Sequence, residues 1–328
     1  VNSESFEVSW EAEDKESGVF VFTLEYKEGD KGKWKLWLKE TKDTKAVFKG
    51  EDSITYYFRI KARDNAGNWS EFYENSSIRT TIDVSPPSAI TQIVAKPLKE
   101  GNVLLEWTKA VDSVSGVDYY RIYRSTVSGQ VGMQICDDGT IRENKFIDDS
   151  RELEDGIIYY YTVRPVDRVG NERESGNKQI LVVCDKFALP PVVKSFTHPM
   201  QDAWYNVKDV KLSWDTPQEA TRITGYYYIF DQNPTTKPDV KTGTWYIDNE
   251  VDLNNVSDGT WYFHVISKDE AGNLSDEAYH YQINIDTTIP KPPVVSSITH
   301  PDFNRWYNNN TPSFTWTIPS DPSGIEGY

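Results

Sequence analysis

The chain reads TYYFRIKARDNAGN at residues 55–68, and the same arrangement returns as IYYYTVRPVDRVGN at 158–171 and as TWYFHVISKDEAGN at 260–273. Before each closing Asp-x-x-Gly-Asn string, apolar side chains alternate with mostly polar ones, which predicts a strand with one buried face. The closing string predicts a hairpin turn, because Gly accepts a positive φ and Asp or Asn bonds to its own backbone. The copies lie 103 and 102 residues apart, so the sequence predicts a repeat of about one hundred residues.

A second marker follows the same period. An alternating run closes on a tryptophan in each repeat, at Trp10, Trp107, Trp214 and Trp316. Further aromatic runs lie between the two markers, and no stretch combines a helical period with helix caps. Short strands separated by Gly, Asn, Asp and Pro turns predict an all-β fold with two packed sheets in each repeat.

The order of a Trp-ending strand, a Tyr-led alternating strand and a Gly-Asn turn resembles the fibronectin type III domain and the related bacterial immunoglobulin-like modules. The resemblance covers nearly the whole chain. It implies a linear array of tandem β-sandwiches in a large bacterial or archaeal surface protein, with the four tryptophans on strand B. It also implies that Tyr56 and Tyr159 are corner tyrosines at the start of strand F, where the third repeat has Trp261. We expect all seven of these aromatic side chains to lie in the cores.

Prolines mark the predicted joints, at Pro86-Pro87, Pro190-Pro191 and Pro290-Lys-Pro292-Pro293. They divide the chain into repeats at 1–84, 85–186, 187–288 and 289–328. The first repeat is expected to lack strand A, and the fourth to be the N-terminal part of a truncated domain. We therefore expect the chain to be a window of a longer tandem array.

Composition excludes several classes of function. The chain has 35 Lys and Arg against 51 Asp and Glu, a formal net charge of −16, which argues against a nucleic-acid partner. No apolar run approaches the roughly 20 residues of a membrane span. Signatures of nucleotide-binding, protease and hydrolase sites are absent from the sequence. We therefore predict no enzymatic activity, no catalytic residue and no organic cofactor.

Calcium is the one metal that the sequence suggests. In this fold the chain enters a domain near its BC and FG loops, so an acidic residue that ends one domain meets those loops of the next. We expect Asp83, Asp112 and Asp167 to converge at the first joint, with Asp185 and Asp269 as candidates at the second. Clustered carboxylates and loop carbonyls supply the six to eight oxygens that calcium prefers. The alternative is that these aspartates only cap their own turns.

Histidines suggest structure rather than metal binding. His198 and His300 occupy the same slot before Pro in two repeats, which predicts a structural turn. His264 and His280 are expected on neighbouring strands F and G. A pair of histidines without a carboxylate partner is not enough to predict a zinc site.

Aromatic side chains leave a polysaccharide partner open, because flat rings stack on sugar faces. The candidate platforms are Trp34, Trp37, Trp69 and Trp245. In the alternative interpretation the outward aromatics form ladders that stabilise the sheets through cross-strand pairs.

The function predicted from these features is a non-catalytic structural segment of a large extracellular or cell-surface protein, acting as a stalk, spacer, filament or surface-layer component. Its expected partners are neighbouring domains of the same longer chain and other copies in a surface assembly. The alternative is an accessory carbohydrate- or protein-binding module of a secreted polysaccharide-degrading enzyme or adhesin.

Overall fold

The computed structural model describes residues 1–327, with the side chains of residues 74–77 left out. It contains two compact units, one of residues 1–96, 103–148 and 158–182, the other of residues 97–102, 149–157 and 183 onward. Nearly all regular structure is β-strand, and the only helical element within 1–327 is the single 3-10 turn Lys99–Gly101. None of the described residues belongs to a helix with the length and apolar character needed to cross a membrane.

The first repeat pairs β1 with β4 in one sheet and orders the other sheet β3-β2-β5-β6. The strands are β1 (Ser5–Ser9), β2 (Val19–Glu28), β3 (Lys35–Thr41), β4 (Lys45–Lys49), β5 (Thr55–Asp64) and β6 (Tyr73–Thr81). Their core is a cluster of rings in which Phe48 contacts Tyr56 and Phe58 edge-on, at centroid distances of 4.9 and 5.0 Å. Such edge-to-face pairs are the favoured geometry for aromatic packing. The hydroxyl of Tyr56 accepts a hydrogen bond from the backbone N–H of Glu51, 2.9 Å away, which ties the start of β5 to the preceding loop.

The second repeat has sheets ordered β11-β8-β7 and β10-β9-β12-β13. Its strands are β7 (Ile93–Pro97), β8 (Val103–Trp107), β9 (Val117–Ser125), β10 (Met133–Gln134), β11 (Lys145–Asp148), β12 (Ile158–Asp167) and β13 (Gln179–Val183). Trp107 is 5% exposed and meets Tyr120 edge-on at 5.2 Å. Tyr159, at the start of β12, is also buried. β8 buries Val103, Leu105 and Trp107 at every second position, and β12 buries Tyr159, Tyr161 and Val163 at the same spacing.

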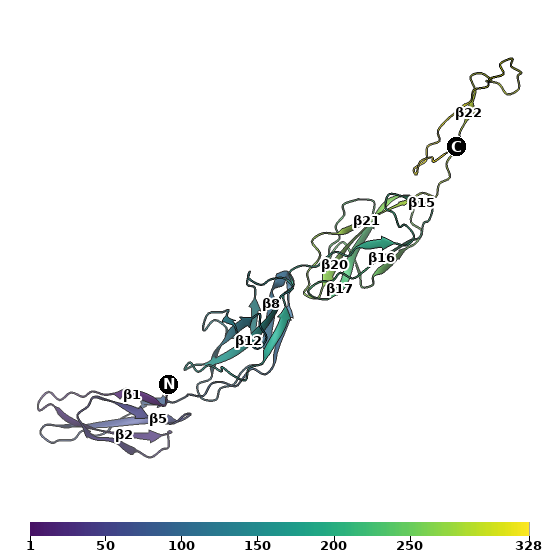
Figure 1. Cartoon of the computed structure of the whole chain (residues 1–328). Coiled ribbons are helices and arrows are strands. Elements are labelled where there is room, and N and C mark those ends of the chain that lie inside the picture. The colour runs from purple at the N-terminus through teal and green to yellow at the C-terminus, as the bar shows by residue number, and fades with distance from the viewer. Residues whose placement is uncertain (328) are drawn as a thin grey trace. The chain divides into compact units, whose positions relative to one another are not determined.

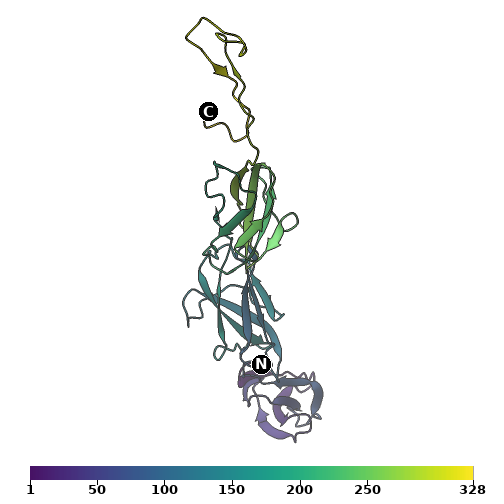
Figure 2. The same cartoon turned by 90° about the vertical axis from the view of Figure 1, so that its right-hand side faces the viewer.

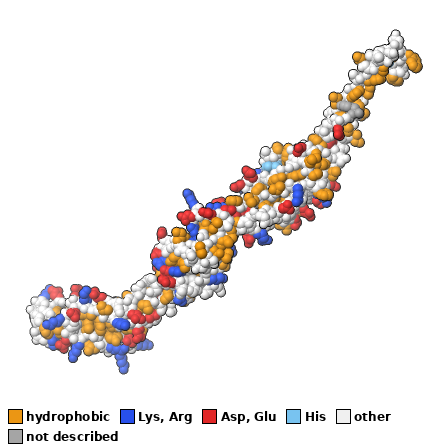
Figure 3. Space-filling view, viewed as in Figure 1, with side chains coloured by type: hydrophobic (Ala, Val, Ile, Leu, Met, Phe, Trp, Pro, Cys, Tyr) orange, Lys and Arg blue, Asp and Glu red, His pale blue; other side chains and the backbone are white. Residues whose placement is uncertain are grey.

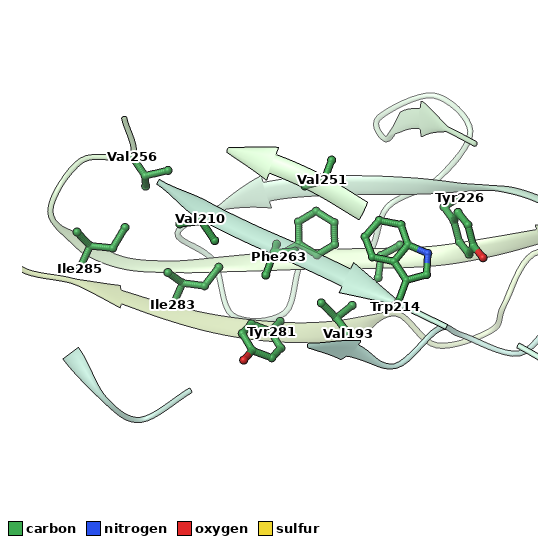
Figure 4. Close-up of a cluster of buried hydrophobic side chains, with 12 residues drawn as sticks. Val193, Val210, Trp214, Tyr226, Val251, Val256, Phe263, Tyr281, Ile283 and Ile285 are labelled. Carbon is green, nitrogen blue, oxygen red and sulfur yellow. The ribbon is translucent and has the colours of Figure 1, made fainter. Parts of the chain in front are cut away.

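The third repeat has sheets ordered β14-β16-β19 and β15-β21-β20-β17-β18. Its strands are β14 (Val193–Ser195), β15 (Trp204–Tyr205), β16 (Val210–Trp214), β17 (Ile223–Asp231), β18 (Thr244–Tyr246), β19 (Glu250–Leu253), β20 (Gly259–Asp269) and β21 (Tyr279–Ile285). The labelled strands of this repeat lie together in the green part of the chain in Figure 1, and the quarter turn of Figure 2 shows the same grouping. Trp214 from one sheet and Phe263 from the other point into the space between the layers (Figure 4), with their rings 5.8 Å apart.

In the fourth segment, one residue predicted to lie in a core is exposed. The strands β22 (Val295–Ser296) and β23 (Thr315–Trp316) pair only with each other, so no facing sheet covers them within the described part of the chain. Trp316 is therefore 51% exposed and is not a core residue here. In Figure 3, hydrophobic side chains, drawn in orange, lie over the end of the chain that is yellow in Figure 1. The exposed large hydrophobic residues of this segment include Phe303 and Trp306. The last residue of the predicted domain, 328, lies outside the described residues.

Two other predicted core aromatics are only half-buried. Trp10 follows β1 directly and meets Phe22 and Trp37 edge-on. Trp261 stacks on Phe230 at 5.0 Å, and its indole N–H donates to the backbone oxygen of Ser257. The third repeat thus has an indole N–H as the hydrogen-bonding group at the position where the first repeat has the hydroxyl of Tyr56.

Candidate functional site

Three aspartates from distant parts of the sequence meet in the first compact unit. Asp83 follows β6, Asp112 lies in the β8–β9 loop and Asp167 ends β12. One carboxylate oxygen from each lies within 4.8 Å of those of the other two, and Asp83 and Asp167 are buried. These are the three residues that the sequence suggested as calcium ligands.

Backbone N–H groups hold the three carboxylates. Oδ1 of Asp112 accepts from residues 114, 115 and 116, and Oδ1 of Asp167 accepts from residues 169, 170 and 171, all at 2.7–3.0 Å. The N–H of Ser115 also donates to Asp83, and the side-chain amide of Asn171 donates to Asp167 and to the backbone oxygen of Asp83. The aspartates therefore cap their turns and also converge, so the two interpretations are not exclusive.

The first cluster has features that suit a hard cation. No Lys or Arg forms an ion pair with these three carboxylates among the residues that the structure describes. The hydroxyl oxygen of Ser115, whose own N–H bridges Asp83 and Asp112, is buried without a hydrogen-bond partner in the described region. Carboxylates and neutral oxygens are the ligands of calcium.

The second unit contains an equivalent arrangement. The side-chain amide of Asn273 donates to Oδ2 of Asp269 at 2.8 Å and to Oδ1 of Asp185 at 3.3 Å, so it joins the two predicted residues. Thr221 donates a further hydrogen bond to Asp185. Burial raises the pKa of Asp185, and the nearby charges of Asp269 and Asp155 add to that effect.

Glu219 completes this second group and was missed by the sequence analysis. Its Oε2 accepts the N–H of Leu189 at 2.8 Å, while its Oε1 is buried with no partner in the described part of the chain. Burial, and then the charges of Asp269, Asp185 and Asp155, raise the pKa of Glu219 to about 7. A signal was available in the sequence, because Glu219 lies five residues after Trp214, as Asp112 does after Trp107.

The same signal leads to a third pair. Asp321 lies five residues after Trp316, and the N–H of Ser323 donates to both Asp321 and Asp286, at 3.1 Å each. Ser115 bridges Asp112 and Asp83 in the same way. The chain therefore repeats an acidic group made of one residue that ends a repeat and one from the first long loop of the next.

The raised pKa of Glu219 predicts how the stability of the fold depends on pH. Because the folded state holds this proton up to about pH 7 and the unfolded chain releases it near the ordinary glutamate value, stability falls as the pH rises between those values. Glu219→Gln should therefore raise the melting temperature at pH 8 and change it little at pH 5. Calorimetry at both pH values checks this, with the exposed Glu250→Gln as control. Equal effects of Glu219→Gln at the two pH values would contradict it.

The histidines divide into two kinds. His198 and His300 each bond through Nε2 to a backbone oxygen and through Nδ1 to the preceding threonine, so both sit in the predicted structural turn. His264 and His280 are register partners on β20 and β21. Contrary to the sequence expectation, this pair has a carboxylate partner, Asp231, whose Oδ1 lies 3.2 Å from Nε2 of His264.

The four candidate sugar platforms have different surroundings. Trp34 lies beneath Lys27 and Arg59, and Trp69 beneath Lys61 and Arg63, at 4.4–5.3 Å from each ring centroid. Trp37 packs in the first core, whereas Trp245 is 42% exposed, rests against Tyr227 and has one cation, Lys268, at 5.8 Å from its ring centroid. The cations occupy the faces of Trp34 and Trp69, so these two rings serve the sheet through cation–π contacts.

Comparison with known proteins gives distant relatives. No family model matches the chain. Titin of Drosophila melanogaster is 24% identical over 89% of this chain and 2% of that protein. Sidekick-2 of Mus musculus and exoglucanase B of Cellulomonas fimi are each 30% identical over 36% of this chain, covering 6% and 10% of those proteins. The chain thus spans a tenth or less of the curated relatives it matches.

A solved structure, that of the chicken CNTN1 FN1–FN3 domains, aligns with 87% of this chain and 95% of that one at 13% identity and a TM-score of 0.36. The relatives come from a fly, a mouse and a bacterium. The paired sheets described above make the first three repeats tandem β-sandwiches with a fold of the fibronectin type III-like, immunoglobulin-like kind.

Proposed function

We propose that the chain is a non-catalytic structural segment of a larger extracellular or cell-surface protein, in which it acts as a spacer or as part of a surface assembly. The observation that carries the proposal is the repeated acidic group, in which an acid that ends one repeat shares N–H donors with the loops of the next. A protein that must hold successive domains at defined joints needs such contacts. The repeats at 1–84, 85–186 and 187–288 are the folding units in this proposal.

The chemistry of the carboxylates supports a structural role. A general acid or nucleophile needs a carboxyl group with oxygens turned toward a substrate. At the first joint, Asp112 and Asp167 instead accept three backbone N–H groups each on Oδ1. These hydrogen bonds use the carboxylates to order loops.

Localisation gives the direct test. Antibodies raised against residues 85–288 should label the surface of intact cells of the source organism in immunogold electron microscopy, with the label repeated along a fibre or layer. Label confined to the cell interior would contradict the proposal, as would hydrolysis of a polysaccharide panel by the purified chain.

We further propose that the first joint binds calcium through Asp83, Asp112 and Asp167. Calcium at 100 times its dissociation constant should stabilise the folded state by about 2.7 kcal/mol. In Asp112→Asn, the amide oxygen still accepts the turn N–H groups but one negative charge is lost, so the response to calcium should weaken strongly. The control is Asp215→Asn, at an exposed carboxylate of the third repeat. Melting that is unchanged between calcium and chelator would remove this proposal.

An accessory binding module is the second candidate. It is favoured by the exposed ring of Trp245 on the outer side of β18 and by the match to an exoglucanase. Polysaccharide pull-down with the wild-type chain and with Trp245→Ala tests it. Retention that depends on Trp245 would support this candidate, and no retention by the wild type would remove it.

A further inference from the structure

We propose that His264 and His280 form a binding site for a divalent transition metal such as Zn²⁺, oriented by Asp231. The site lies on the outer face of the larger sheet of the third repeat, away from the acidic groups at the joints. It is independent of the proposed structural function. Imidazole nitrogens are favoured ligands of zinc, copper and nickel.

The position of the two histidines follows from strand register. On β20, Phe263 and Val265 point into the core, so His264 points to the opposite face. His280 is directly opposite on β21. The two Nδ1 atoms face each other at 2.5 Å, and the ring planes are inclined at 74°. Two imidazole nitrogens from separate strands are thus directed at each other.

The contact with Asp231 determines which ring nitrogen of His264 carries no proton. Oδ1 of Asp231 lies 3.2 Å from Nε2 of His264, so that nitrogen carries the proton and donates it to the carboxylate. Nδ1 is then left unprotonated and turned toward His280. This is the arrangement in which a carboxylate orients a metal-binding histidine through its second nitrogen.

The carboxylate is itself held in place. The N–H of Asn233 donates to its Oδ1 at 2.9 Å, and the hydroxyl of Thr236 donates to its Oδ2 at 2.7 Å. Lys237, the next residue, donates to the backbone oxygen of Asp276 in the loop that joins β20 to β21. The connection after β17 therefore crosses the outer face, and His264 beneath it is fully buried.

The site is nevertheless open on one side. His280 is an exposed residue, so its ring has room to move and a metal can approach past it. Zn–N bonds of about 2.0–2.1 Å in a tetrahedral site place two nitrogens about 3.3 Å apart, which requires an opening of less than about 1 Å from the present separation. Water fills the remaining coordination positions.

The contacts of the two rings are compatible with neutral tautomers that can bind metal. Without metal, Nδ1–H of His280 donates to Nδ1 of His264. When metal binds, that proton moves to Nε2 of His280, both Nδ1 lone pairs become ligands, and no net proton is released.

Titration of the full chain with Zn²⁺ tests the site. Excess Ca²⁺ in the buffer keeps the carboxylate clusters occupied. We expect one saturable Zn²⁺ per chain and a rise in the melting temperature of the third repeat. His280→Ala, at an exposed position, should abolish saturable binding. Asp231→Asn should weaken binding by about 10- to 100-fold, the usual cost of losing a carboxylate that orients a ligand.

The control is His300→Gln, which removes a histidine of the structural turn and should bind as the wild type does. In nuclear magnetic resonance spectra, Zn²⁺ should shift the imidazole nitrogens of His264 and His280 together and leave those of His198 in place. The inference is overturned if the wild type takes up no saturable equivalent of Zn²⁺. It is equally overturned if His280→Ala binds Zn²⁺ as tightly as the wild type.

Discussion

Replacing Trp214 with alanine is expected to destabilise the third repeat by about 3–5 kcal/mol, because a buried indole is lost and a cavity remains. Trp214 is 2% exposed, and its ring contacts Tyr226 and Phe263, which both come from the opposite sheet. A loss of this size is a large share of the roughly 5–15 kcal/mol that holds a domain folded. Calorimetry of the full chain should show one transition moving down by more than about 10 °C.

The same experiment tests whether the repeats fold independently. The transition of the second repeat should stay in place in Trp214→Ala and should move instead in Trp107→Ala. Trp245→Ala removes an indole that is 42% exposed and should cost less than about 1 kcal/mol. If either core variant moves every transition together, the repeats do not fold as separate units.

Removal of the buried carboxylate in the second repeat is the other large effect that we expect. Asp148 is 1% exposed, and its Oδ2 accepts from the guanidinium of Arg124 and from the hydroxyl of Tyr161, both at 2.7 Å. Asp148→Ala takes the counter-charge from a guanidinium that is itself 7% exposed, which typically costs about 3–5 kcal/mol. Urea unfolding of the full chain measures this loss.

A triple variant separates charge from packing. Arg124→Met, Asp148→Leu and Tyr161→Phe together replace the ion pair and the hydroxyl bonded to it by apolar groups of similar size, and should recover most of the stability lost in Asp148→Ala. Glu106→Ala breaks an exposed ion pair with Lys145 in the same repeat and should cost less than about 0.5 kcal/mol. An Asp148→Ala variant within 1 kcal/mol of the wild type would show that the guanidinium finds another way to be satisfied.

Local periodicity was sufficient to predict the strands. Alternation around Trp107 and Trp214 depends only on which side chains face inward, and the hairpin turns depend on Gly and Asn at fixed positions. Convergence of Asp83 with Asp112 and Asp167 also followed, because it needs only the position of loops at one end of a sandwich. The prediction that Trp316 is a core residue was wrong. Its burial needs a second sheet, and no second sheet faces β23 in the described segment.

Other parts of the sites depend on details beyond residue type. Glu219 was not predicted from the sequence, although its distance from Trp214 repeats that of Asp112 from Trp107. Asp231 lies 33 positions from His264 in sequence. Their contact requires the antiparallel pairing of β17 with β20 and a loop folded over the outer face. Alternation alone specifies neither.

Each acidic group at a joint is divided between two repeats. The first repeat ends with Asp83 and the second with Asp185, and each meets an asparagine, Asn171 or Asn273, from the following Gly-Asn turn. A gene duplication that copies one hundred residues therefore copies both halves of the connection at once. Units with these two halves are interchangeable, so such a protein can lengthen or shorten over evolution without a new interface being invented.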